Sequence, residues 1–516
     1  MNRLIPKPNG FYQEKDGYFM LESLINVYKG DFSSRAISAF EERLELTLSE
    51  VPANQAALRL FCDDGFAHEA YRLVVDESGV QVTAADESGV IWALTSLYSL
   101  LEKGGFPYVT IEDEPKYTHR GFMMDCARHF FSVAVVKEII EQNSLVKLNV
   151  FHWHLSDDQG WRVESTAFPR LHELSGQEYY TKEQLCEVAT FAAVRGVEII
   201  PEIDMPGHML AAIAAYPSFS CRGEATAPAT QAGIYETILC AGKEETYEFA
   251  KTVLDELCEV FPGSYIHIGG DEVPKKEWEA CPYCREKLAA IGRTDFEELQ
   301  SHFMQEMFAH LTERGKQSIA WNDVLKGTIS PNEVVVQHWL EIGESDCTRP
   351  FLEKGGKVIF SDMFALYFDY TEGFSGLKRV YEYTPTIKGE LFSEHDGCLG
   401  IQACLWSERV ADVKTLHKRI YPRLFAVAEA AWSKERDYDD FELRLGRKLK
   451  ALKRSRIGYR RLKSCNPKKI KRTMEVMKFM KGFSAARETG NAPDFSPEMI
   501  QQFLDNFGLT ELIRKK

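Results

Sequence analysis

Eight short apolar segments, separated by longer polar or amphipathic stretches, constrain the fold of this 516-residue chain most strongly. We expect them to be strands at 120–125, 148–154, 196–203, 264–270, 317–321, 333–338, 356–361 and 398–405. Helices are predicted between them at 132–147, 181–194, 244–260 and 294–313, the second and last opened by the capping boxes Thr181/Gln184 and Thr294/Glu297. Eight strand–helix units in about 320 residues favour an α/β fold, the closed (β/α)8 TIM barrel.

A doubly wound open sheet is the alternative arrangement. Its nucleotide-binding form carries Gly-x-Gly-x-x-Gly after the first strand, and no such motif follows residue 125. A nucleotide site therefore has no support, and no cofactor is expected.

Two further regions flank the predicted barrel. Residues 1–115 are expected to form an α+β domain, with strands at 43–48, 57–61, 71–75 and 80–84 and a helix at 88–102. Residues 76–79, Asp-Glu-Ser-Gly, predict a hairpin turn between the last two of these strands. We place the barrel domain at 116–435 and a C-terminal basic helical extension at 436–516.

The charge distribution argues against general nucleic-acid binding. The formal net charge is −15, whereas such binding requires a basic surface. Residues 447–472 are the local exception, with thirteen Lys or Arg and no acid. We interpret this basic segment as a helix whose solvated face packs against an acidic body, and contact with an anionic polymer or envelope is the alternative.

Cysteine usage and the N-terminal sequence favour the cytoplasm. The first ten residues lack the apolar core of a signal peptide, and no apolar stretch is long enough to span a bilayer. Twelve cysteines are scattered along the chain, many of them inside apolar runs, as in a reduced protein. Cys281 and Cys284 have metal or redox spacing, but no second such pair accompanies them, so we expect no metal site.

Polar and aromatic residues gather directly after the predicted strands. In a (β/α)8 barrel the catalytic groups lie at the carboxyl ends of the strands. All eight ends carry an acid, His, Arg or Trp: Asp125/Arg128, His154/Asp157, Asp204/His208, Asp271/Glu272, Trp321/Asp323, Trp339, Tyr367/Asp369 and Trp406/Glu408. This regularity predicts an active site at that face.

The adjacent acids Asp271 and Glu272 follow the apolar run 265–268 and two glycines. A solvated turn is one interpretation, because Gly-Gly-Asp-Glu is also favourable loop sequence. Acid/base chemistry is the other, because two neighbouring carboxylates cannot both ionise cheaply when buried. The strand-end residues Trp321, Trp339 and Trp406 indicate a carbohydrate pocket, since aromatic faces beside carboxylates suit a sugar ring.

The acid pair also limits the mechanism. A retaining glycosidase with a carboxylate nucleophile needs two carboxyl groups about 5–5.5 Å apart around the anomeric carbon. Neighbouring strand residues point to opposite sides, so Asp271 and Glu272 are poorly placed to bracket one carbon. Their arrangement suits a substrate that carries its own nucleophile.

These segments resemble glycoside hydrolase family 20, the β-N-acetylhexosaminidases. His267–Glu272 looks like the family's His-x-Gly-Gly-Asp-Glu signature. Further similar segments are Arg120–Phe131, His152–Arg162, Pro201–His208 and Leu405–Glu408. The resemblance covers 115–435, and residues 1–115 resemble the α+β domain that precedes the barrel in this family.

The resemblance implies exo-acting removal of terminal non-reducing β-linked GlcNAc or GalNAc by retaining, substrate-assisted hydrolysis through an oxazolinium ion. It implies that Glu272 is the general acid and base, that Asp271 holds the acetamido N–H, and that Tyr367 bonds the acetamido oxygen. Asp157 and His208 are similar to the pair that tunes the general acid. The implied substrate-binding residues are Arg128, Trp321, Trp339, Asp369, Trp406 and Glu408. Two departures are mild: Asn322-Asp323 after Trp321, and Phe368 between Tyr367 and Asp369.

Two other functional classes stay open on the residues alone. A metal-dependent hydrolase could use His152 and His154, which share one strand face, together with Asp204, His208 and Asp271. A non-catalytic sugar-binding protein would need the tryptophans without a positioned acid. GlcNAc and GalNAc differ only at O4, so the preferred sugar stays open, as does the oligomeric state.

Overall fold

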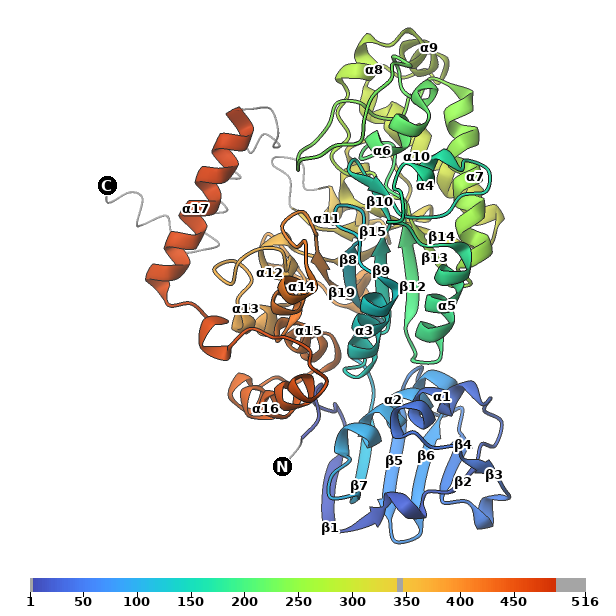
Figure 1. Cartoon of the computed structure of the whole chain (residues 1–516), viewed down its shortest axis with the longest axis vertical. Coiled ribbons are helices and arrows are strands. Elements are labelled where there is room, and N and C mark those ends of the chain that lie inside the picture. Colours follow the sequence, from blue (N-terminus) through green and yellow to red (C-terminus); the bar gives the residue numbers. More distant parts are fainter. Residues whose placement is uncertain (1–2, 341–346, 489–516) are drawn as a thin grey trace.

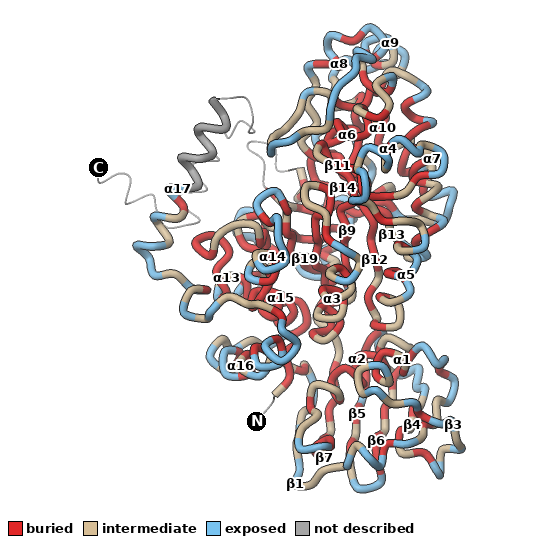
Figure 2. Tube along the Cα trace, viewed as in Figure 1, coloured by how far each residue is buried: buried red, intermediate tan, exposed pale blue. Residues whose placement is uncertain are grey.

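The computed structural model describes residues 3–340 and 347–488 of the chain. Figure 1 shows a sheet domain at one end of the long axis, a barrel in the middle, and the C-terminal helices beside the barrel. Buried segments run along the barrel strands and along the inner faces of the helices around them (Figure 2). Within the described residues, no helix combines the length and apolar character needed to cross a bilayer.

The N-terminal domain is a seven-stranded mixed sheet with the order β1-β7-β5-β6-β4-β2-β3. Two helices, α1 (Arg35–Leu44) and α2 (Glu87–Leu100), pack together, and α2 covers β5, β6 and β7. The strands are β1 (Tyr12–Met20), β2 (Asn26–Tyr28), β3 (Ser49–Glu50), β4 (Leu58–Cys62), β5 (Tyr71–Asp76), β6 (Gly79–Ala84) and β7 (Gly105–Asp113).

Most of the elements predicted in this domain are confirmed, and one is wrong. The hairpin forms as expected, since Asp76 pairs with Gly79 across the turn between β5 and β6. The expected strand at 43–48 is instead the end of α1 and the loop after it. Its alternating leucines cross a helix end, where Glu45 is a left-handed C-cap with φ 54°.

The predicted barrel is confirmed. Eight parallel strands close in the order β12-β13-β14-β15-β16-β19-β8-β9. Each corresponds to one predicted strand: β8 (His119–Asp125), β9 (Val150–His154), β12 (Glu198–Glu202), β13 (Tyr265–His267), β14 (Gln317–Trp321), β15 (Val334–His338), β16 (Lys357–Phe360) and β19 (Cys398–Leu405). Two small hairpins, β10–β11 (156–157, 160–161) and β17–β18 (386–387, 390–391), lie outside the barrel sheet.

The four predicted helices are present, and one of the two capping boxes forms. Thr181 and Gln184 cap α5 reciprocally as predicted. The box Thr294/Glu297 is wrong, because Asp295 is the N-cap of α10 and accepts from the Glu297 amide at 3.0 Å. The barrel-domain helices are α3 (Val133–Ser144), α4 (Arg170–Glu173), α5 (Lys182–Ala193), α6 (Leu210–Ala215), α7 (Glu244–Val260), α8 (Lys276–Ala280), α9 (Pro282–Ala290), α10 (Phe296–Glu313), α11 (Thr348–Glu353), α12 (Met363–Leu366), α13 (Leu377–Glu382), α14 (Val413–Ile420) and α15 (Arg423–Trp432).

A buried ion pair joins the sheet domain to the barrel. Arg120, at the start of β8, donates to both carboxylate oxygens of Glu69 at 2.7 Å. The indole of Trp92 in α2 also donates to Glu69, at 2.9 Å, and its ring meets that of Trp432 in α15 edge to face. The first residue of the family-like segment 120–131 therefore fixes the domain junction and lies at the opposite end of β8 from the predicted site.

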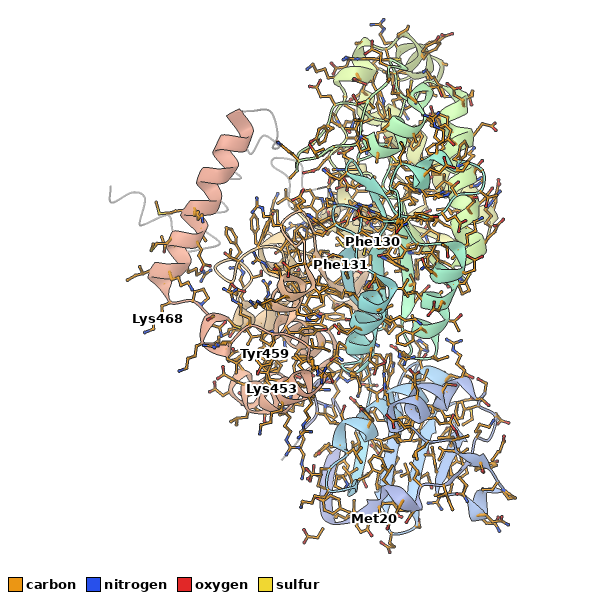
Figure 3. All side chains as sticks on the ribbon, viewed as in Figure 1. Met20, Phe130, Phe131, Lys453, Tyr459 and Lys468 are labelled. Atoms are coloured by element: carbon orange, nitrogen blue, oxygen red, sulfur yellow. The ribbon has the colours of Figure 1, made fainter. Side chains whose placement is uncertain are left out.

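The basic segment 447–472 is not the single helix that its charge pattern suggested. It covers the end of α16 (Tyr438–Arg454), a short turn and the start of α17 (Lys469–Glu488). Lys453 and Lys468 mark its exposed side on the outside of the molecule (Figure 3). One of its residues outside the helices, Arg460, pairs with Glu372 of the barrel domain at 2.8 Å.

Candidate active site

Four polar side chains end consecutive barrel strands at the same level. Asp125, His154, Glu202 and His267 are the last residues of β8, β9, β12 and β13, and the strand register aligns them with one another. The register therefore builds a polar layer at the carboxyl end of the barrel, where the sequence predicted an active site.

Glu202 is the centre of this layer and is fully buried. Its carboxylate accepts from Trp321 Nε1 at 2.9 Å and lies 2.9 Å from His152 Nε2 and 3.0 Å from His267 Nδ1. His154 Nδ1 bonds to it as well. Burial opposes ionisation, but the three imidazoles hold the pKa of Glu202 well below its usual range. Sequence reasoning did not select Glu202, although an acid at the end of an apolar strand was a usable signal.

A second ionic chain runs from His154 to the rim of the barrel. His154 Nε2 lies 2.9 Å from Asp157 Oδ2, and Arg128 Nη2 lies 2.7 Å from the same oxygen. Burial opposes charge on His154, yet Glu202 and Asp157 raise the pKa of His154 to about 10. Burial also opposes ionisation of Asp157, but Arg128 and His208 hold the pKa of Asp157 well below its usual range. The chain is thus an alternating row of acids and cations.

Two glycines shape the turn that presents the acid pair. Gly269 and Gly270 have φ values of +66° and +95°, which favour glycine. A Cβ on Gly269 would lie 1.6 Å from Asp204 Oδ1, and one on Gly270 would lie 2.6 Å from Val324 Cγ1. The amide of Gly270 donates to Asp204 at 3.0 Å, so Asp204 supports the turn.

His208 connects Asp157 to the acid pair. Its Nδ1 lies 3.2 Å from Asp157 Oδ1, and its Nε2 lies 3.7 Å from Glu272 Oε2 and 3.8 Å from Asp271 Oδ2. The structure therefore brings together four of the five predicted catalytic residues in one short row.

Burial shifts the pKa values of Asp271 and Glu272 away from those of exposed carboxyl groups. It raises the pKa of Glu272 to about 8, with a further increase from the charge of Asp271 and an opposing effect from His208. Burial raises the pKa of Asp271 too, and His208 opposes this. Burial disfavours the imidazolium of His208, but Asp157 and Asp204 raise the pKa of His208 well above its usual range. A protonated Glu272 beside a cationic His208 is therefore the expected state near neutral pH.

Four aromatic residues, which we call the aromatic cluster, pack together: Trp321, Trp339, Tyr367 and Trp406. Tyr367, the fifth predicted catalytic residue, stacks on Trp339 with ring centroids 6.3 Å apart, and it lies 6.2 Å from Trp406. Trp321 lies 5.8 Å from Trp406 and is only 1% exposed, so it forms the base of the cluster. Trp339 and Trp406 are half-buried.

The position of Trp339 is fixed by two residues in the turn directly after the neighbouring strand β14. Asp323 accepts from the indole of Trp339 at 2.8 Å, and Asn322 accepts from its backbone amide at 3.0 Å. The Asn322-Asp323 sequence thus has a local structural function. Asp323 also acts on the acid pair, because its negative charge raises the pKa of both Asp271 and Glu272.

Arg128, Glu408 and Asp369 are the remaining predicted binding residues. The guanidinium of Arg128 lies over the Trp406 ring, 4.9 Å from its centroid. Burial raises the pKa of Asp369 to about 7, and the charge of exposed Glu408 raises it further. The negative charge of Glu408 also raises the pKa of Arg128. The predicted sugar-edge residues are therefore electrostatically coupled to one another.

Several buried polar atoms of the predicted site residues have no hydrogen-bond partner among the described residues. They are Arg128 Nε, His208 Nε2, Asp271 Oδ1 and Asp369 Oδ1. Buried polar atoms are nearly always satisfied in native proteins. These unsatisfied donors and acceptors, together with the aromatic cluster, could bond the hydroxyl groups of a ligand.

Asp125 has a structural function instead. Its carboxylate accepts from the amides of Ala127 and Arg128 at 2.7 and 3.1 Å, and from the amide and hydroxyl of Ser407 at 2.9 and 3.0 Å. It thereby shapes the loops that carry Arg128 and Glu408.

The histidines considered for a catalytic metal are engaged in hydrogen bonds. His152 Nδ1 accepts from Gln402 at 2.8 Å, which leaves the ring proton on Nε2, 2.9 Å from Glu202 Oε2. Both ring nitrogens of His154 bond to carboxylates. Protonated nitrogens cannot ligate a metal, so these contacts favour the hydrogen-bonded layer over a metal site built on these two residues.

Comparison with known proteins gave concordant results. The family model described as "Glycosyl hydrolase family 20, catalytic domain" matches residues 117–435, and "Glycosyl hydrolase family 20, domain 2" matches residues 1–114. A curated β-hexosaminidase from Porphyromonas gingivalis is 34% identical over 452 residues, which are 81% of this chain and 58% of that protein. The chain thus spans less than two thirds of that relative's length.

Two solved structures share the fold. An exo β-N-acetylglucosaminidase from Vibrio harveyi, in complex with N-acetylglucosamine, has a TM-score of 0.79 and 30% identity, covering 89% of this chain and 78% of that one. A β-N-acetylhexosaminidase from Bacteroides fragilis has a TM-score of 0.80 and 31% identity, covering 89% of this chain and 96% of that one.

Proposed function

The chain belongs to glycosyl hydrolase family 20, and from this membership we propose that it is an exo-acting β-N-acetylhexosaminidase. The proposed substrates carry a terminal, non-reducing, β-linked GlcNAc or GalNAc. The names of the matched relatives support this reaction class. The acid pair, the alternating row of acids and cations, and the aromatic cluster at one end of the barrel support it independently.

The proposed mechanism is retaining and substrate-assisted. The 2-acetamido oxygen attacks C1 while Glu272 donates its proton to the glycosidic oxygen, and an oxazolinium ion forms. Glu272 then takes a proton from water, which opens the ion and leaves the β configuration. The pKa of about 8 supports the first step, because Glu272 carries the proton it must donate at neutral pH.

Asp271 and Tyr367 are assigned to the acetamido group. The Asp271 carboxylate accepts from the acetamido N–H and offsets the positive charge of the oxazolinium ion. The hydroxyl of Tyr367 donates a hydrogen bond to the acetamido oxygen. Burial raises the pKa of Tyr367 well above its usual value, which keeps this hydroxyl a donor.

The remaining site residues are assigned to recognition and tuning. Trp339 and Trp406 stack on the sugar, above Trp321 at the base. Arg128 and Glu408 bind the O3/O4 edge, and Asp369 reaches O6. His208, held by Asp157, faces Glu272 and stabilises its ionised form after proton donation.

The location of the protein is proposed from its cysteines. No disulfide joins any of the twelve, which supports a reducing compartment such as the cytoplasm. The acidic net charge supports a glycan rather than a nucleic acid as the ligand.

One arrangement carries the proposed function: half-buried Glu272, whose pKa is raised to about 8, lies next to Asp271 and faces His208. The test compares kcat/KM for aryl β-GlcNAc, β-GalNAc and β-glucoside. We expect hydrolysis of one or both N-acetyl substrates and almost none of the glucoside, which lacks the amide. Equal turnover of the glucoside would refute the substrate-assisted mechanism.

A further inference from the structure

Four cysteines from three segments of the chain converge beside the loops of the active-site face. Cys221 and Cys240 lie in the long connection between α6 and α7. Cys281 is the N-cap of α9, and Cys284 lies in its first turn. The sulfur atoms are 3.8 Å apart for Cys221–Cys284 and Cys240–Cys281, and 3.5 Å apart for Cys240–Cys284. All four lie within 4.8 Å of one another.

These separations fit a tetrahedral thiolate site. Zn–S bonds of about 2.3 Å in tetrahedral geometry place the sulfurs about 3.8 Å apart. A disulfide requires about 2.0 Å, and all four cysteines are free. We propose that Cys221, Cys240, Cys281 and Cys284 bind one structural Zn²⁺ ion, a site that the spacing of Cys281 and Cys284 alone did not predict.

The backbone around the four cysteines is packed tightly enough to hold them in place. The Cys240 amide donates to the Phe219 carbonyl at 2.8 Å, which pairs the two segments that carry Cys221 and Cys240. A Cβ on Gly242 would lie 2.4 Å from the Cys284 backbone nitrogen, so only glycine allows this approach. Three of the four cysteines are buried, and Cys221 is half-buried.

The surroundings also suit the charge of the centre. Zn²⁺ with four thiolates carries a net negative charge. Lys243 donates to the carbonyl oxygens of Ser218 and Ser220 at 2.8 and 2.7 Å, which holds its ammonium beside the Cys221 segment. Arg222 follows Cys221 directly and pairs with Glu277 at 3.1 Å. Both cations lie next to ligand-bearing backbone.

The site connects the two loops that carry the acid–base residues. Leu239, next to Cys240, donates its amide to the Pro206 carbonyl at 3.0 Å, two residues before His208. Its carbonyl accepts from the Trp278 indole at 2.9 Å, and Trp278 lies between Glu272 and Cys281. A metal at the cysteines would therefore cross-link the His208 loop to the Glu272 loop, at the end of the molecule occupied by α8 and α9 (Figure 1).

The first test measures metal and thiols in the full chain, made with zinc supplied and purified without chelators. We expect about one zinc per chain by elemental analysis, released by a mercurial reagent. The denatured protein should titrate twelve thiols. Absence of zinc overturns the site, and fewer than twelve thiols in zinc-free protein shows disulfides in its place.

The second test uses variants with matched controls. Cys281→Ser and Cys284→Ser should each reduce the zinc content to below about a tenth of that in the wild type, since three thiolates bind far more weakly than four. Cys62→Ser and Cys186→Ser change exposed cysteines outside the cluster. Both variants should keep the zinc content of the wild type. Zinc retained in Cys281→Ser and Cys284→Ser would contradict the proposal.

A third measurement needs no variant. Wild-type chain reconstituted with Co²⁺ should show the absorption of tetrahedral cobalt thiolate, and a spectrum of octahedral oxygen ligation would refute the assignment. These readouts do not depend on the proposed hydrolase activity. Chelator removal of zinc should lower kcat/KM for aryl β-GlcNAc through the His208 and Glu272 loops. The ligand variants should lose the same fraction of activity, and a chelator effect that persists in them would place an essential metal elsewhere.

Discussion

His208 Nε2 lies 3.7 Å from Glu272 Oε2, and both residues have a left-handed backbone, with φ values of 54° and 49°. A non-glycine residue in this region costs about 1–2 kcal/mol. Strained residues of this kind concentrate at functional sites, where the surrounding structure holds them in place. The strain at both ends of one contact indicates that the chain maintains this contact at the expense of stability.

This strain leads to a stability prediction. Glu272→Gly should be more stable than Glu272→Ala by about 1 kcal/mol in chemical denaturation, because glycine adopts a φ of 49° without steric cost. Exposed Glu248, the fifth residue of the 17-residue helix α7, is the control. There the order should reverse by a similar amount, since glycine is unfavourable in a helix. Equal stability of the two Glu272 variants would mean that the backbone at this position is relaxed.

Glu272→Gln tests the proton donor directly. The amide keeps the shape of the side chain but cannot donate the proton, so kcat should fall by about 10²–10⁴ on a substrate with a poor leaving group. KM should change little. Glu248→Gln serves as the control and should keep wild-type kinetics. Near-native kcat in Glu272→Gln would remove Glu272 from its assigned function.

The pH profile tests the electrostatics of the same residue. Because the protonated acid is the active form and its pKa is about 8, kcat/KM should fall above roughly that pH. His208 favours the ionised form, so its removal in His208→Asn should raise the pKa of Glu272 and move the alkaline limb to higher pH. His395→Asn, at an exposed histidine, should leave the limb in place. A shift to lower pH in His208→Asn would contradict the assignment.

The barrel and most of the strand-end residues could be predicted from the sequence, because strand periodicity is local and the barrel topology then places every strand end at one face. The partners of those residues could not. Glu202 contacts residues from three other strands, and only the closed register brings them together. Arg128 was expected to face the sugar, and its salt bridge to Asp157 depends on two loops whose paths the sequence does not specify.

The cysteine cluster shows the same limit. Cys281 and Cys284 have metal spacing, but no metal site was expected there, because no second such pair accompanies them. Cys221 and Cys240 are separated from each other and from that pair by long stretches of chain. Their approach depends on the backbone pairing of Phe219 with Cys240, a long-range contact without a sequence motif. The capping error at Thr294 has a smaller cause, since Asp295 is an equally good N-cap one residue later.

Two variants of Asp323 should distinguish its effect on the position of Trp339 from its effect on the pKa of Glu272. Asp323→Ala removes the acceptor for the Trp339 indole, and KM should rise about 3- to 10-fold, the effect of one lost hydrogen bond. Asp323→Asn retains an acceptor oxygen but loses the charge that raises the pKa of Glu272. Its KM should stay near that of the wild type, while the alkaline limb moves to lower pH. Identical behaviour of the two variants would show that Asp323 has only one of these functions.

The buried pair Arg120–Glu69 should dominate the stability of the domain junction. Glu69→Gln leaves the Arg120 guanidinium buried and unpaired, and breaking such a pair costs about 3–5 kcal/mol. Arg72 and Glu112, a pair about half exposed with a separation of 3.4 Å, provide the control within the same domain. Glu112→Gln should cost about 0–1 kcal/mol, because exposed pairs are screened by water. Denaturation of both variants, followed by the fluorescence of the eight tryptophans, which include Trp92 and Trp432 at the junction, measures the difference. If Glu69→Gln and Glu112→Gln were equally stable, the junction would depend on apolar packing around Trp92 and Trp432 rather than on the ion pair.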